Sequence, residues 1–170
     1  LLMIGMQYAA CGIISEAMIW TCVAVGLLVT NIVYSHAVLD LKADTQANKM
    51  TFARLLKSNN MRLFFSALFN ILPFIIVIIG VVLGHLHWAY LCVMPLLPMG
   101  IYLIYSLKAH LDNKEIAFEP RWWMGPMGNF DSYRKHNMDW FLIRWLVARN
   151  LVTFFCLILM IVNIILAIYK

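Results

Sequence analysis

The sequence has few charged residues. Asp, Glu, Lys and Arg make up 12% of its 170 residues, whereas 64% are hydrophobic. A soluble domain usually carries about a quarter charged residues, so this composition excludes an ordinary soluble domain. The apolar residues come in long blocks, which predicts an all-α integral membrane protein whose main partner is the lipid bilayer.

Cysteine pairs, repeats and a secretion signal are also missing. The four cysteines are scattered through apolar segments without a C-x-x-C pair, which favours small core residues over disulfides or metal ligands. The start of the chain has no basic region and no small-residue cleavage site, which argues against a signal peptide. Its first residues are already apolar, so we expect the chain to begin inside a helix, as a fragment lacking an N-terminal part.

Long apolar runs define the predicted topology. A spanning helix needs roughly 20 apolar residues. We therefore expect one transmembrane domain over residues 1–170, as a polytopic bundle with four complete spans and a partial N-terminal one. The expected spans are residues 1–12 (partial), 17–39, 61–84, 88–107 and 139–169. Ser15 and Glu16 interrupt the first apolar run and predict a tight turn.

Two long polar loops, residues 40–60 and 108–138, contain or adjoin nearly all the basic residues. Alternating spans place both loops on one side of the membrane, and the positive-inside rule predicts that this side is cytoplasmic. Topology thus accounts for the net charge of +5, and nucleic acid is not expected as a partner.

The stretch HAVLDLKADTQANKMTF, residues 36–52, places Asp40 and Asp44 four residues apart after an apolar run. On a continuing helix, both carboxylates point from one face, about one turn apart. Mg²⁺ prefers hard oxygen ligands and commonly bridges one or two carboxylates to substrate phosphates. Lys49 and Arg54 follow and could contact phosphate oxygens. The spacing is therefore compatible with a magnesium-diphosphate site.

The same residues also fit simpler interpretations. Asp40 could pair with Lys42 or cap the next turn, as in any solvated loop. The alternative functions are a non-catalytic membrane scaffold and a cation-transport subunit. Cation transport would need acidic residues inside the spans, and such residues are almost absent here.

The segment from Tyr34 to Thr51 resembles the second aspartate-rich motif of the UbiA superfamily of intramembrane prenyltransferases. That pattern reads D-x-x-x-D, a short spacer, G-K-x-T and a leucine-rich stretch. Asp40 and Asp44 match the acids, and Lys49 and Thr51 match the G-K-x-T piece. Leu55 and Leu56 match the stretch that follows.

Two positions depart from the family pattern, and a third bears on the acceptor. Lys42 stands where many members have another acid, Asn48 replaces the glycine, and His36 stands where quinone-pathway members often have Asn or Tyr. The Lys42 change bears on metal binding, and the His36 change bears on the choice of acceptor.

The resemblance implies the C-terminal half of a nine-helix enzyme. Such enzymes transfer an isoprenoid chain from a polyprenyl diphosphate donor to an aromatic or quinone-precursor acceptor. A first guess for the acceptor is 1,4-dihydroxy-2-naphthoate, as in menaquinone synthesis. Asp40 and Asp44 would be the catalytic residues and ligands of Mg²⁺, and the bacterial inner membrane the location. The family's first motif, N-x-x-x-D-x-x-x-D, does not occur in this sequence.

Several further residues are candidates with structural alternatives. Lys49, Asn31, Tyr34 and Arg54 are predicted to bind substrate. Asn31 could instead bond a neighbouring helix, as we expect for Asn70 and Asn163, and Tyr34 could be an interfacial aromatic. The loop 118–127 is either a re-entrant lid or an interfacial loop, and we favour the interfacial loop. Arg149 either anchors the last helix or faces the cavity.

Overall fold

The fold is a helical bundle. The computed structural model describes residues 2–114 and 119–169, and its regular elements within these ranges are all helices. The long ones are α2 (Glu16–Leu39), α5 (Asn59–Val82), α6 (Leu97–Leu111) and α8 (Asp139–Ile168). A 3₁₀-helix, η1 (Trp88–Leu96), leads directly into α6. Counting η1 with α6, four helical segments are long and apolar enough to cross a membrane. The prediction of an all-α fold with four helical segments of spanning length is thereby confirmed.

Short helices occupy the N-terminus and the two polar segments. They are α1 (Leu2–Cys11), α3 (Leu41–Gln46), α4 (Phe52–Leu55), η2 (Trp122–Met124) and α7 (Phe130–Lys135). Residues 115–118, which include the start of the loop expected at 118–127, lie outside the described residues.

The third span differs most from its expected course. It was expected over residues 88–107, but regular α-helix begins at Leu97 and continues to Leu111. Pro95 and Pro98 explain the late start, because proline lacks the amide hydrogen and clashes with the preceding turn of an α-helix. The residues before them form the tighter 3₁₀-helix instead.

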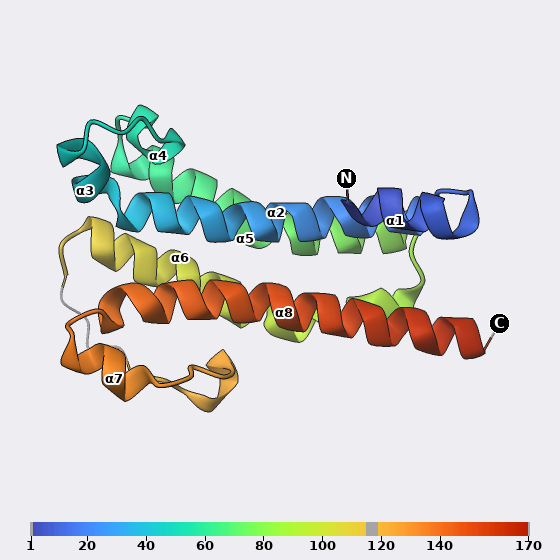
Figure 1. Cartoon of the computed structure of the whole chain (residues 1–170). Helices are drawn as coiled ribbons and strands as arrows, with labels where there is room; N and C mark the ends of the chain where they lie inside the picture. The colour runs from blue at the N-terminus through green and yellow to red at the C-terminus, as the bar shows by residue number, and fades with distance from the viewer. Residues whose placement is uncertain (1, 115–118, 170) are drawn as a thin grey trace.

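The four spans pack side by side. Helix α2 contacts both α5 and α8, and α6 also contacts both, which closes the bundle. Both long polar segments lie at the same end, which carries α3, α4 and α7, while α1 folds back beside the opposite end of α2 (Figure 1). Ser15 begins α2 there as its N-cap and accepts a 3.3 Å hydrogen bond from the Met18 amide.

Buried polar side chains join the helices. Asn31 of α2 and Asn70 of α5 exchange two amide hydrogen bonds of 3.0 Å. Arg144 of α8 is 3% exposed and donates to the Ser106 carbonyl of α6 at 3.0 and 3.1 Å. Such bonds hold helices together where surrounding lipid offers no polar partner. The interhelical bond expected of Asn70 is confirmed.

Candidate functional site

Asp40 and Asp44 lie where α2 passes into α3. The Asp44 amide donates a 2.8 Å hydrogen bond to the Asp40 carbonyl, so one helical turn links the two residues. Both side chains line one cavity of about 340 Å³ at the polar end of the bundle. The other lining residues are Ile32, Val33, His36, Ala37, Lys49, Thr51 and Trp145.

A tight turn brings Lys49 to Asp44. Asn48 has a left-handed backbone with φ +52°, a conformation that Gly adopts freely and Asn more readily than most other residues. The Asn48 amide bonds the Thr45 carbonyl at 3.3 Å, and the Lys49 amide bonds the Asp44 carbonyl at 2.9 Å. This pair of bonds is the Schellman ending of a helix. It explains why asparagine can stand where the family pattern has glycine.

The two carboxylates have different surroundings. Asp44 is buried, with its side chain 10% exposed, and the Lys49 ammonium lies 3.7 Å from its Oδ1. Asp40 is 38% exposed, and its Oδ2 lies 3.0 Å from Nδ1 of His36. The second oxygen of each carboxylate has no protein partner among the described residues. Each acid therefore retains an oxygen for a ligand.

The Thr51 hydroxyl is the least satisfied polar group of the site. Its Oγ1 is buried and is the only such side-chain atom without a hydrogen-bond partner in the part of the chain that the structure describes. Thr51 lines the same cavity as Asp44 and Lys49. Buried hydroxyls are normally paired, so this one is an exception among the described residues.

Three predicted substrate residues lie elsewhere. Asn31 bonds Asn70, and the Tyr34 hydroxyl donates to the Arg62 carbonyl at 2.8 Å. Neither lines the cavity. The helix explains this for Asn31, because nine residues at about 100° each place it opposite Asp40 on α2.

Arg54 is also outside the cavity lining. Its guanidinium donates to the Lys49 carbonyl at 3.0 Å and to the Asn48 side chain at 3.3 Å. It therefore supports the turn that positions Lys49, and Lys49 alone of the predicted substrate residues lines the cavity.

Trp145 was not predicted at this site. It lies in α8, more than a hundred residues beyond Asp40, and forms the aromatic part of the wall. Phe141, one turn before it, contacts the His36 ring edge-on at 5.0 Å. The i, i+4 spacing of Phe141 and Trp145 indicated that both lie on one face of α8. It did not indicate that this face packs against α2.

Arg149 does not reach the cavity either. Its guanidinium donates to the Asn150 side chain at 2.9 Å and to the Pro126 carbonyl at 3.1 Å. It lies over the Trp145 ring at 5.9 Å. The segment that contains Pro126 contacts α8 and is not part of the Asp40 cavity.

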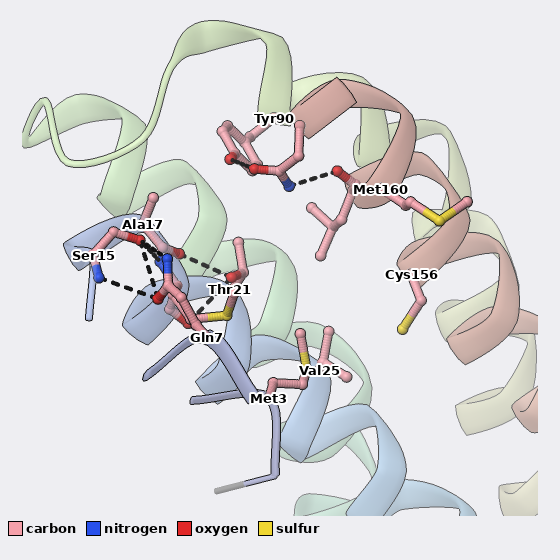
Figure 2. Close-up of a pocket in the computed structure, with 12 residues that line it drawn as sticks. Met3, Gln7, Ser15, Ala17, Thr21, Val25, Tyr90, Cys156 and Met160 are labelled. Carbon is pink, nitrogen blue, oxygen red and sulfur yellow. Dashed lines mark hydrogen bonds between the residues drawn. The ribbon is translucent and has the colours of Figure 1, made fainter. Parts of the chain in front are cut away.

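A second cavity, of about 190 Å³, lies toward the opposite end of the bundle. Figure 2 shows it between α1, α2, η1 and α8, with the Gln7–Ser15 hydrogen bonds on one side and Tyr90 on the other. Tyr90 donates a 2.7 Å hydrogen bond to Asn163 across the η1–α8 contact, which confirms the interhelical bond expected of Asn163. These polar groups bond one another, and the cavity has no acidic residue in its wall.

Comparison with known proteins assigns no family to this chain. No family model, no curated protein and no solved structure matches it.

The donor set restricts the kind of metal site. Among the described residues, no group of three or more His, Cys, Asp or Glu side chains could hold a metal ion. A metal bound by protein ligands alone is therefore not indicated.

Proposed function

We propose that the chain serves in the Mg²⁺-dependent transfer of an isoprenoid chain from a polyprenyl diphosphate to an aromatic or quinone-precursor acceptor. The observation that carries this proposal is that Asp40, Asp44, Lys49 and Thr51 all line one cavity. These are the four polar positions at which the sequence matches the UbiA motif.

Each side chain has a role in this proposal. Asp40 and Asp44 hold Mg²⁺ through their unpaired oxygens, and the Lys49 ammonium contacts the diphosphate. The buried Thr51 hydroxyl contacts it after the side chain turns toward the cavity. Bound Mg²⁺ supplies positive charge that stabilises the departing diphosphate. The Lys49 side chain is 69% exposed, so it can move from Asp44 to a phosphate oxygen without leaving a packed position.

The apolar wall supports an isoprenoid donor. Ile32, Val33, Ala37 and Trp145 line the cavity beside the carboxylates. A ligand with a charged head and a hydrocarbon tail could therefore bury each part against matching groups. The proposal places this reaction at the cytoplasmic face of the bacterial inner membrane, with 1,4-dihydroxy-2-naphthoate as the first acceptor to test.

Binding of a non-hydrolysable farnesyl thiodiphosphate to the full chain in lipid nanodiscs tests the proposal. We expect binding in Mg²⁺ that is lost in EDTA. Asp40→Ala and Asp44→Ala should each weaken it about tenfold or more, since a hydrogen bond or contact to a charged group contributes about 1.5–3 kcal/mol. Thr51→Val should weaken it less. Asp131→Asn, on the exposed surface of α7, is the matched control.

The outcomes separate the candidate functions. A scaffold predicts no Mg²⁺-dependent binding, and a cation-transport subunit predicts Mg²⁺ binding that the diphosphate does not strengthen. Either result, or equal affinity of the Asp40 and Asp131 variants, would overturn the proposed function.

A further inference from the structure

The segment Glu119–Asn129 follows the outside of the bundle and does not cross its polar end. Figure 1 shows the chain before α7 extending along α8 and returning. A Cβ added at Gly125 would lie 2.7 Å from the Phe154 ring, so Gly125 lies close against α8. Phe154 is five residues beyond Arg149, the last charged residue of α8. At 1.5 Å per residue, Gly125 therefore lies ~7.5 Å past that charge, beside the apolar part of the span.

The backbone of this segment has protein partners at that depth. Asn150 donates to the Met124 carbonyl at 2.8 Å and to the Pro126 carbonyl at 3.0 Å. Arg149 also donates to the Pro126 carbonyl. Pro120 and Pro126 have no amide hydrogen to satisfy. Irregular backbone at membrane depth is tolerated where protein groups satisfy it in this way.

The two sides of the segment differ. On the inner side, Met124 is 1% exposed, and Trp123 contacts the Tyr102 ring of α6 edge-on at 5.3 Å. On the outer side, Trp122 is 93% exposed, and Arg121 beside it is exposed as well. Tryptophan concentrates at the boundary between lipid headgroups and acyl chains, and a neighbouring arginine can reach phosphate groups.

We propose that the outer side of this segment is a phospholipid-binding surface. Trp122 enters the headgroup–acyl boundary of the leaflet at the Asp40 end, and Arg121 binds lipid phosphate. Asn150 and the close approach of Gly125 to Phe154 hold the segment at that depth. This inference is independent of the proposed enzymatic function, because none of these residues lines the Asp40 cavity.

Spin labels in nanodiscs of mixed anionic and zwitterionic phospholipid test this surface. The background is the full chain with its four native cysteines replaced by Ser. The label is attached at Trp122→Cys in one variant and at Arg121→Cys in a second, and the second variant retains Trp122. Lys57→Cys, in the exposed linker between α4 and α5, is the aqueous control. We expect collisions with a water-soluble nickel chelate at least ~fivefold below those at position 57, and collisions with oxygen to be high, as for an interfacial site.

Gly125→Ala tests how the segment is held. Its Cβ would overlap Phe154, so we expect the label at position 121 to become accessible to nickel to about the level at position 57. Three results would overturn the proposal. The first is that the nickel chelate reaches both labels in the parent chain. The second is that the labels are protected from both nickel and oxygen, which indicates that protein covers the surface, and the third is that Gly125→Ala leaves the nickel accessibility of the label at position 121 unchanged.

Discussion

The Asn31–Asn70 pair allows a quantitative test of what holds α2 to α5. The side chains are 1% and 0% exposed and exchange two hydrogen bonds of 3.0 Å. Asn70 also donates to the Ser66 carbonyl at 2.9 Å, while Asn31 has only a weaker 3.4 Å bond from Ser35 in addition. Asn31 therefore depends on Asn70 for its hydrogen bonds more than Asn70 depends on Asn31.

Replacing either partner with Val leaves the other amide partly unpaired. A buried unpaired polar group costs about 1–3 kcal/mol, whereas interhelical bonds in membrane proteins contribute about 0.6–2 kcal/mol. We therefore expect Asn70→Val to lower the free energy of unfolding by about 1–2 kcal/mol. Asn31→Val should cost less, because Asn70 keeps its bond to Ser66. The double variant should be less destabilised than the sum of the single variants by about 1 kcal/mol.

The assay is equilibrium unfolding in mixed detergent micelles with a rising fraction of SDS, followed by circular dichroism. Thr30→Val is the control, since its exposed hydroxyl bonds only the Gly26 carbonyl of its own helix, and it should change stability by less than about 0.5 kcal/mol. Strict additivity of the two Asn substitutions would refute the reasoning, because it would mean that the amides do not interact.

Three further predictions use other contacts. Gly80→Ala should cost about 1–3 kcal/mol in the same unfolding assay, because its Cβ would lie 2.7 Å from Leu86. A Cβ at Gly26 would have no atom within 4 Å, so Gly26→Ala should not destabilise the fold. Equal losses of unfolding free energy in the Gly80 and Gly26 variants would contradict the packing argument. Asn48→Gly should keep the affinity for a diphosphate ligand in the nanodisc assay, whereas Asn48→Val should lower it about five- to thirtyfold, because a left-handed backbone costs such a residue about 1–2 kcal/mol; similar affinities would exclude a role for the turn. Arg144→Lys should lower the free energy of unfolding by about 2 kcal/mol, because lysine cannot reproduce the paired bonds to the α6 carbonyl; wild-type stability would show that a charge alone suffices.

The length of the apolar runs and the composition were enough to predict the helical architecture. The long apolar runs predict four spans, since each must satisfy its backbone internally over the width of a bilayer. The turn near Ser15 was also predictable from local sequence, because a polar residue that can cap a helix interrupts the apolar run there. The 3₁₀ start of the third span was not predicted, although both prolines that cause it were visible.

At the candidate site, local sequence determined the spacing of Asp40 and Asp44, since a helical turn connects them. Asn48 as a turn residue also followed a local rule, because few residues tolerate a positive φ.

Only the tertiary structure decided which faces meet. Packing placed Asn31 against α5 and the opposite face of α2 against α8, where Trp145 joins the acidic pair in one cavity wall. It also left the Thr51 hydroxyl unpaired. The segment before α7 came to lie against Phe154. A sequence pattern fixes the angle between side chains on one helix, but it does not state which neighbouring helix lies at that angle. That choice depends on contacts between segments far apart in the chain, where side-chain shape and buried hydrogen bonds select one arrangement.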